Sequence, residues 1–250
     1  TAFGSSDNRL PAVESAGKVS AARQRLTLWN RRRVRAKLAG KHLRGKGIEI
    51  GALHQPMSVP PGAMVRYLDR LTTDQLREEY PELQAFNLVE VDIVEDGENP
   101  VSIPNQSQDF VIASHVIEHT EDPIKTIRNW LRILRPGGVI FLVVPDRRRT
   151  FDRNRPPTPV EHLLRDYRFG PEGSRMEHYR EWVQELEDVE DVNARALELI
   201  EQGYRPHFHV WTPDEFRQSL ADIAEAEKLP MTVVDSATNF REFMVVISKT

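Results

Sequence analysis

Residues 109–119 read Asp-Phe-Val-Ile-Ala-Ser-His-Val-Ile-Glu-His, and the fold class can be worked out from this stretch. Residues 109–113 are mainly apolar and predict a short buried strand, and the polar residues that follow predict a loop. Asp122 and Pro123 come next and suit the N-cap and first position of a helix. That helix should stop at Pro136-Gly137-Gly138, before another apolar run. Strand, helix and strand in this order predict a parallel βαβ unit.

The same alternation continues on both sides of this unit. Gln75 stands three residues after Thr72, which is the spacing of a capping box, and Thr212-Pro213-Asp214-Glu215 is a second clear helix start. We therefore predict a Rossmann-like α/β fold with a mostly parallel seven-stranded sheet, an antiparallel last strand and helices on both faces. The predicted strands are 47–51, 64–68, 88–91, 109–113, 139–144, 231–234 and 243–248, and a first helix is predicted over Arg23–Leu43.

The chain is long enough for one domain with an insertion. It has 250 residues, and a domain commonly has about 150. Residues 1–21 are small, polar and aperiodic, which predicts a flexible tail before a single domain over 22–250. The alternation breaks over 147–206, where a Pro-rich run precedes two helical patterns. Because this insertion follows the fifth strand, we expect it to form a lid that binds the acceptor at the strand ends.

Composition excludes several classes of protein. There are no cysteines, which excludes disulfide scaffolds, thiolate zinc sites and cysteine nucleophiles. The mean hydropathy is -0.51 and no apolar run nears the roughly 20 residues of a membrane span, so no span is expected. Residues 1–17 lack the basic-then-apolar pattern of a secretory signal, so we expect a cytoplasmic protein. The net charge of -4 argues against nucleic-acid binding. Eleven basic and no acidic residues lie between Ala16 and Ile48, which favours a solvated amphipathic helix over contact with an anionic partner.

The predicted strand ends carry residues that suit an adenosine-containing ligand. Gly51 would let a ligand approach the backbone closely. Asp69, twenty residues beyond Glu49, suits a ribose diol, and Asp92 could accept from the exocyclic amine of a purine. Each acid could instead cap a helix, but three strand ends in register favour a ligand site.

These segments resemble the class I S-adenosylmethionine-dependent methyltransferases, in particular bacterial enzymes that act on small molecules and glycans. The resemblance is carried by 47–52, 67–70, 91–93, 109–119 and 134–138. It departs from the family at Gly51-Ala52-Leu53-His54-Gln55-Pro56, where relatives have two or three glycines. The resemblance implies S-adenosylmethionine as the cofactor, bound by Glu49, Gly51, Ala52, Asp69, Arg70, Asp92, Ile93, Ser114, His115 and His119.

A competing pattern lies within the same motif. Residues His115 to His119 have the H-x-x-E-H spacing of inverted zinc peptidases. Zinc ligation would need both histidines on one face of a helix. His115 is predicted at a strand end and a loop follows His119, so the methyltransferase interpretation is preferred.

Candidate acceptor residues concentrate in and just after the insertion. His162 precedes Asp166 by four residues and follows Thr158 by four, so all three would share a helix face, and His162 becomes the candidate general base. Asp146, at the end of the fifth strand, is its rival. His207 and His209 alternate and could form a pair that binds sugar or a divalent metal such as Mg²⁺, or they could be two surface histidines near a helix start. Phe151 and Trp211 could stack on a sugar or belong to the core. The candidate substrate-binding residues are Asp152, Arg155, His178, His207, His209 and Trp211.

We therefore expect an S-adenosylmethionine-dependent O-methyltransferase that acts on a saccharide hydroxyl. The insertion resembles that of bacterial methyltransferases linked to cell-surface glycans, and the arginine-rich composition favours an actinobacterial glycan such as a methylated mannose polysaccharide. The alternatives are an O- or N-methyltransferase of a secondary metabolite and a cofactor-binding protein without turnover. The expected partner is a small-molecule or oligosaccharide acceptor, with no nucleic acid and no membrane span. A homodimer stays open.

Overall fold

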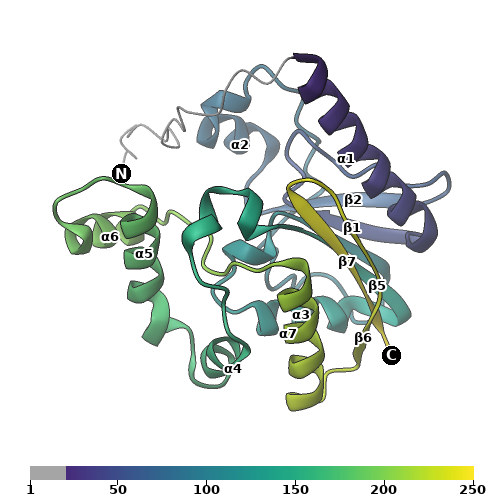
Figure 1. Ribbon diagram of the computed structural model, residues 1–250. Helices are drawn as coiled ribbons and strands as arrows, with labels where there is room; N and C mark the ends of the chain where they lie inside the picture. Colours follow the sequence, from purple (N-terminus) through teal and green to yellow (C-terminus); the bar gives the residue numbers. More distant parts are fainter. Residues whose placement is uncertain (1–20) are drawn as a thin grey trace.

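A computed structural model describes residues 21–250, with side chains described from Arg32 onward, so the expected tail at 1–21 falls almost entirely outside the described residues. Within this range, seven strands form one sheet in the order β3-β2-β1-β4-β5-β7-β6 (Figure 1). The first five strands pair in parallel and β7 runs antiparallel to β5 and β6, which confirms the expected fold class. The strands are β1 (Lys46–Ile50), β2 (Met64–Asp69), β3 (Ile93–Val94), β4 (Gln108–Ser114), β5 (Leu134–Pro145), β6 (Met231–Thr238) and β7 (Glu242–Lys249).

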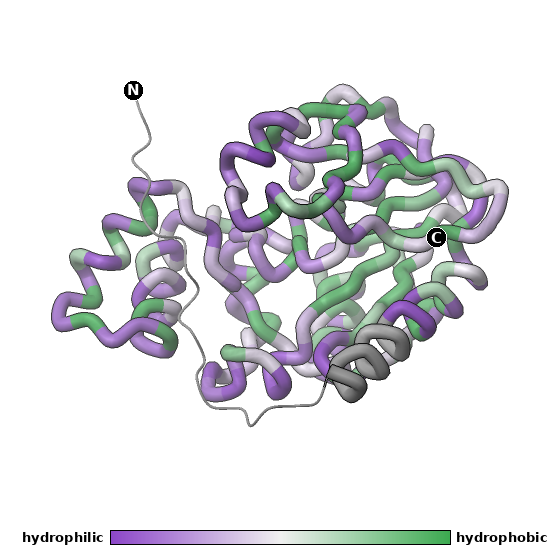
Figure 2. Tube along the Cα trace, turned by 90° about the horizontal axis from the view of Figure 1, so that it is seen from above, coloured by the Kyte–Doolittle hydropathy of each residue, from purple (hydrophilic) through white to green (hydrophobic). Residues whose placement is uncertain are grey.

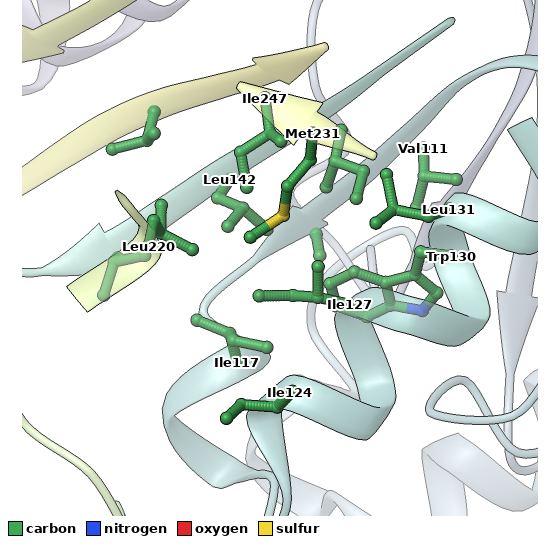
Figure 3. Close-up of a cluster of buried hydrophobic side chains, with 14 of the residues drawn as sticks. Val111, Ile117, Ile124, Ile127, Trp130, Leu131, Leu142, Leu220, Met231 and Ile247 are labelled. Carbon is green, nitrogen blue, oxygen red and sulfur yellow. The ribbon is translucent and has the colours of Figure 1, made fainter. Parts of the chain in front are cut away.

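Apolar side chains alternate between the two faces of the central strands and build a core on each. Along β5, Ile140 and Leu142 belong to one core, and Phe141 and Val143 to the other. The first core packs against α3 (Pro123–Ile133) and includes Trp130 (Figure 3). On the opposite face, α1 (Ala21–His42) covers the second core through side chains such as Leu38 and Leu43, the latter just beyond its end. Figure 2 shows the strands as a hydrophobic interior between more polar helices.

The expected helix starts are confirmed. Thr72 and Thr212 each form a capping box, before α2 (Thr73–Glu79) and α7 (Pro213–Ala226). Asp122 caps α3 by accepting from the Lys125 amide, with Pro123 at the first helical position. Because these caps satisfy amides that have no partner within the helix, they determine where each helix begins.

Three predicted strands have clearly different bounds in the structure, and one of them, β6, runs to Thr238 instead of ending at 234. The third strand is Ile93–Val94 and not 88–91, so Asp92 precedes the strand instead of ending it. The fifth strand begins at Leu134, so Pro136-Gly137-Gly138 lies within it, and a register shift in its pairing with β4 accommodates this segment. Gly137 has a φ of +74°, a conformation that glycine adopts without strain.

The insertion packs into two cores: α5 and α6 build a small core of their own, while Leu163 of α4 belongs to the first core of the sheet. It contains two short 3₁₀ turns (Arg147–Arg149 and Phe151–Asn154) and three helices within the described chain, where two helical patterns were predicted. Helices α5 and α6 stand apart from the sheet (Figures 1 and 2) and pack around Trp182, Val183 and Phe208. The three helices of the insertion are α4 (Val160–Phe169), α5 (Glu172–Leu186) and α6 (Val192–Glu201).

Between residues 21 and 250, no helix combines the length and the apolar character that crossing a membrane requires.

Candidate active site

The carboxyl ends of β1 and β2 lie side by side at one edge of the sheet. Ile50 pairs with Leu68, and the amide of Gly51 donates to the carbonyl of Leu68 at 3.0 Å. Gly51 has a φ of +65°, and a Cβ added there would meet only the Val116 side chain, at 3.5 Å. The backbone at Gly51 is therefore open to a ligand.

Asp69 ends β2 beside Gly51 and is half-buried. Burial raises the pKa of Asp69, and hydrogen bonds from backbone amides oppose that shift. One of its oxygens accepts from the Arg70 amide at 2.7 Å, which leaves acceptor capacity for a ligand hydroxyl. The Arg70 side chain is exposed and pairs with Glu79 at 2.6 Å. Of Asp69 and Arg70, only Asp69 keeps a side-chain acceptor at the strand end.

The role expected for Asp92 does not fit its position. Asp92 precedes β3, and its carboxylate accepts from the Tyr67 amide at 2.7 Å, so it fastens β3 to β2. Ile93 is the first residue of β3 itself. The acidic residue directly after the strand is Glu95, whose carboxylate accepts from the amide and hydroxyl of Ser102, each at 2.8 Å. The sequence interpretation missed Glu95 because it placed the strand too early.

Glu49 is a buried support of the loop after β1. Its side chain is fully buried, and both carboxylate oxygens accept from the amide of Met57. Burial raises the pKa of Glu49 to about 7, although the Met57 hydrogen bond and the charge of Arg35 oppose the shift. Glu49 therefore shapes the loop in place of the missing glycines.

The same loop turns tightly at Ala52. The amide of Gln55 donates to the Ala52 carbonyl at 2.9 Å, and Leu53 has a positive φ of 47°. Ala52 is buried, and the Leu53 carbonyl accepts from Val89 at 2.9 Å. A turn anchored at both ends replaces the glycine-rich loop of the resembled family.

Ser114 and His115 end β4 at the same edge, and His115 joins a charged cluster. The Nε2 of His115 lies 3.1 Å from Glu242, which is buried in β7 and makes a two-pronged ion pair with Arg35 of α1. Burial lowers the pKa of His115, but Glu118 and Glu242 outweigh it and raise the pKa to about 9. Arg35 of the basic helix α1 thus forms an ion pair inside the fold. Arg35 and Glu242 are 207 residues apart in the chain, so no local sequence pattern could predict their contact.

The chain after α6 lies against the loops that follow β4 and β5. The amide of Phe208 donates to the Glu118 carbonyl at 2.8 Å, and Trp211 forms a parallel bridge with Asp146. The Nδ1 of His119 lies 3.0 Å from the carbonyls of Arg205 and Pro206. The histidine-rich segment therefore lies at the strand ends, as expected, and His119 supports this segment.

The histidines in and just after the insertion form two groups. His162, His178 and His209 make one, which we call the three-histidine cluster. Within it, the Nε2 atoms of His162 and His178 are 2.9 Å apart, and Asp166 lies 3.1 Å from His162. His207 turns instead to Asp152, at 2.7 Å. His207 and His209 thus belong to different groups and do not form the single pair that was considered.

His162 lies beside Asp166, as its helical spacing predicts, while Thr158 lies outside the helix. Burial lowers the pKa of His162, the Asp166 carboxylate opposes this shift, and the charge of Arg165 lowers the pKa further. The ring is therefore neutral near pH 7. Burial likewise lowers the pKa of His178 to about 3. Thr158 precedes α4 and hydrogen-bonds with Val210, so it does not share a helix face with His162.

Asp146 is tied to an arginine. Its two carboxylate oxygens accept from the Arg148 guanidinium at 2.9 and 2.7 Å. Burial raises the pKa of Asp146, but Arg148 outweighs it, and the net pKa is lowered. A carboxylate with a lowered pKa is a weak proton acceptor.

Three candidate substrate-binding residues are enclosed by protein. Asp152 and Arg155 are almost fully buried and pair at 2.8 Å, while Arg155 also binds Glu181. Trp211 is fully buried and contacts Phe216. It therefore fits the alternative of a core residue, and not that of a side chain stacked on a sugar. These residues support the insertion and do not face an acceptor.

Known proteins similar to this chain include methyltransferases. A family model described as a methyltransferase domain matches residues 32–223. A probable S-adenosylmethionine-dependent methyltransferase of Mycolicibacterium smegmatis is 36% identical over 92 residues, which are 37% of this chain and 32% of that protein. The match thus spans about a third of that curated relative.

Solved structures with a similar fold include a SAM-dependent methyltransferase from Aquifex aeolicus, with 13% identity and a TM-score of 0.46 over 86% of this chain and 87% of that one. A possible histamine N-methyltransferase from Thermotoga maritima has 14% identity and a TM-score of 0.45 over 91% and 96% of the two chains.

Proposed function

The chain belongs to the methyltransferase-domain family whose model matches residues 32–223, and from this premise we propose that it is an S-adenosylmethionine-dependent O-methyltransferase acting on a hydroxyl of a saccharide. The acceptor would be a small saccharide or an oligosaccharide, with a mannoside of a methylated polysaccharide as the leading candidate. Bound S-adenosylmethionine would supply an electrophilic methyl group.

The edge of the sheet supports the cofactor half of the proposal. Gly51 leaves the backbone open, and Asp69 on the neighbouring strand keeps a free acceptor. Both sit at the carboxyl ends of parallel strands, where ligands bind in open α/β sheets. We assign Asp69 to the ribose hydroxyls and Gly51 to close backbone contact.

One observation carries the acceptor half of the proposal. The segment that holds His207 and His209 hydrogen-bonds to the loop after β4 and bridges to the end of β5. This fastens the insertion, 147–206, beside the edge where the methyl group would be presented. We therefore propose that the insertion covers the acceptor and excludes water from it.

His162 is the proposed general base. Burial lowers its pKa, and its Nδ1, which accepts from Arg165 at 2.7 Å, would take the proton of the acceptor once that arginine turns aside. Asp166 lies 3.1 Å from Nε2 and would stabilise the charge that appears on the ring. A divalent ion such as Mg²⁺ could instead lower the pKa of the hydroxyl directly. His162 would then serve to position the acceptor.

The proposal is tested by an acceptor screen with S-adenosylmethionine labelled in its methyl group. Mannosides and other saccharides, phenolic metabolites and RNA are supplied separately, and labelled product is measured. Transfer to saccharides alone is the expected result. Transfer to phenols or amines would favour a secondary-metabolite enzyme. Cofactor binding by calorimetry without transfer to any acceptor would favour a binding protein.

A further inference from the structure

A second group of potential metal ligands lies outside the three-histidine cluster. Glu118 and His119 belong to the 3₁₀ turn Ile117–His119 after β4, and His207 comes from the segment after α6. One ligand atom from each of the three lies within 4.8 Å of the others. The His119 and His207 rings contact each other edge to face, with centroids 4.7 Å apart. Two imidazoles and one carboxylate thus converge from two parts of the chain.

The Glu118 carboxylate is buried without a hydrogen bond. Its side chain is 0% exposed, and neither oxygen has a hydrogen-bond partner among the residues that the structure describes. The nearest cation is His115, whose Nδ1 lies 3.4 Å from one oxygen. Burying a carboxylate is costly, and His115 reaches only one of its two oxygens, so the other oxygen is left to the side of His119 and His207. A metal ion between Glu118 and the two histidines would supply positive charge to that oxygen.

Both histidines keep a lone pair for a ligand. The Nδ1 of His119 faces two backbone carbonyls, and the Nδ1 of His207 faces the Asp152 carboxylate. Carbonyls and carboxylates only accept hydrogen bonds, so each Nδ1 must carry the proton. In the neutral ring, Nε2 is therefore the nitrogen with a free lone pair, and it is the atom that would bind a metal.

The surroundings hold these ligands in place. Arg155 fixes Asp152 at 2.8 Å and also donates to the His207 carbonyl. The amide of Phe208 donates to the Glu118 carbonyl, which joins the two contributing segments. Metal-binding histidines are commonly oriented by carboxylates and carbonyls in this manner. The ligands are therefore positioned before any ion arrives.

We propose that Glu118, His119 and His207 form a binding site for one divalent transition-metal ion, of the class of Zn²⁺, Mn²⁺, Fe²⁺ or Co²⁺. Two neutral imidazoles and a carboxylate are a donor set that these ions prefer, whereas Mg²⁺ favours oxygen ligands. Three protein ligands leave coordination positions open. The site goes beyond the proposed methyl transfer and does not depend on the identity of the acceptor.

The three-histidine cluster is the rival site, and its hydrogen bonds count against it. Arg165 lies 2.7 Å from the Nδ1 of His162, and a guanidinium can only donate. The Nε2 of His162 must then carry a proton, which it can donate to His178 at 2.9 Å. Two of the three rings therefore satisfy each other, although the Nδ1 of His209 has no hydrogen-bond partner within the described part of the chain.

The test uses the full chain, stripped of metal, titrated with Co²⁺ and followed by calorimetry and visible absorption. We expect one ion per chain, and a loss of affinity of at least about 100-fold in both Glu118→Gln and His207→Asn, because each removes a ligand. His54→Asn, at a histidine far along the chain from the site, is the control and should bind as the wild type does. Circular dichroism checks that each variant is folded.

Three results would overturn the proposal. They are failure of the folded wild type to bind Co²⁺, unchanged binding in both ligand variants, and loss of binding in His178→Asn with Glu118→Gln unaffected. Should the variants not fold, X-ray absorption of the cobalt-loaded wild type decides the matter without them. Two imidazoles with oxygen ligands support the site, and three imidazoles assign the ion to the three-histidine cluster.

Discussion

Both carboxylate oxygens of Glu49 accept from a single amide, that of Met57, at 2.9 and 3.0 Å. Glu49 lies in β1 and Met57 in the loop beyond it, so this contact sets how the chain leaves the strand beside the proposed cofactor site. The carboxylate has no exposed surface. The relationship leads directly to a dependence of stability on pH.

Glu49→Gln should remove part of that dependence. The pKa of Glu49 is raised from 4.5 to about 7, so the folded state holds a proton that the unfolded chain has lost. The stabilisation from this proton is complete below pH 4.5 and is lost as the pH rises through 7. We compare the unfolding free energy of Glu49→Gln with that of the wild type at each pH. The difference in favour of the variant should be about 1 to 3 kcal/mol larger at pH 8 than at pH 4. Urea unfolding at both values measures this, and parallel profiles would contradict it.

Asp69→Ala should weaken binding of S-adenosylmethionine by about 1 to 3 kcal/mol, because charge-assisted hydrogen bonds to the ribose are lost. Calorimetry measures the affinity. Asp92→Ala is the matched control. The Asp92 carboxylate accepts from the Tyr67 amide, so its removal should leave the affinity for S-adenosylmethionine nearly unchanged. Equal losses in the two variants would remove Asp69 from its proposed role.

His162→Ala should lower turnover by roughly 10² to 10⁴ while cofactor affinity is kept, as expected for loss of a general base. Steady-state kinetics on the acceptor found in the screen measures this. Glu161→Ala, at the exposed neighbouring position, serves as the control. Wild-type turnover in His162→Ala would move the base elsewhere, and Asp146 would be the next residue to replace.

Trp182→Ala should loosen the insertion and leave the sheet intact. Trp182 is 4% exposed and packs against Phe151 and Tyr204 in the small core of α5 and α6. Removing such a side chain costs about 3 to 5 kcal/mol. Hydrogen exchange should become faster in α5 and α6 and stay slow in β4 and β5. Uniform acceleration across the chain would show that the two cores unfold together.

The sheet and most helix starts could be predicted because their signals are local. The apolar run after Asp109 and the caps at Thr72, Asp122 and Thr212 were all confirmed. These signals depend on residues within one or two turns of each other. The third strand was misplaced because Leu88-Val89 is as apolar as Ile93-Val94, and only pairing with Leu68 and Asp69 selects the later pair.

The candidate site was only partly predictable. The pair of His162 and Asp166 followed from helical spacing and was confirmed at 3.1 Å. The separation of His207 from His209 could not be foreseen, because their partners, Asp152 and His178, lie far away along the chain. The same holds for the link from Arg35 through Glu242 to His115.

The order of strands and helices along the chain, and the residue types at the strand ends, follow from the sequence alone. Periodicity and capping are properties of neighbouring residues, so they can be read along the chain. Which side chains are enclosed, and which histidine meets which carboxylate, became visible only in the folded chain. Burial and pairing depend on segments that the fold brings together, and they alone distinguish Glu118, buried without a hydrogen bond among the described residues, from Asp152, buried beside Arg155.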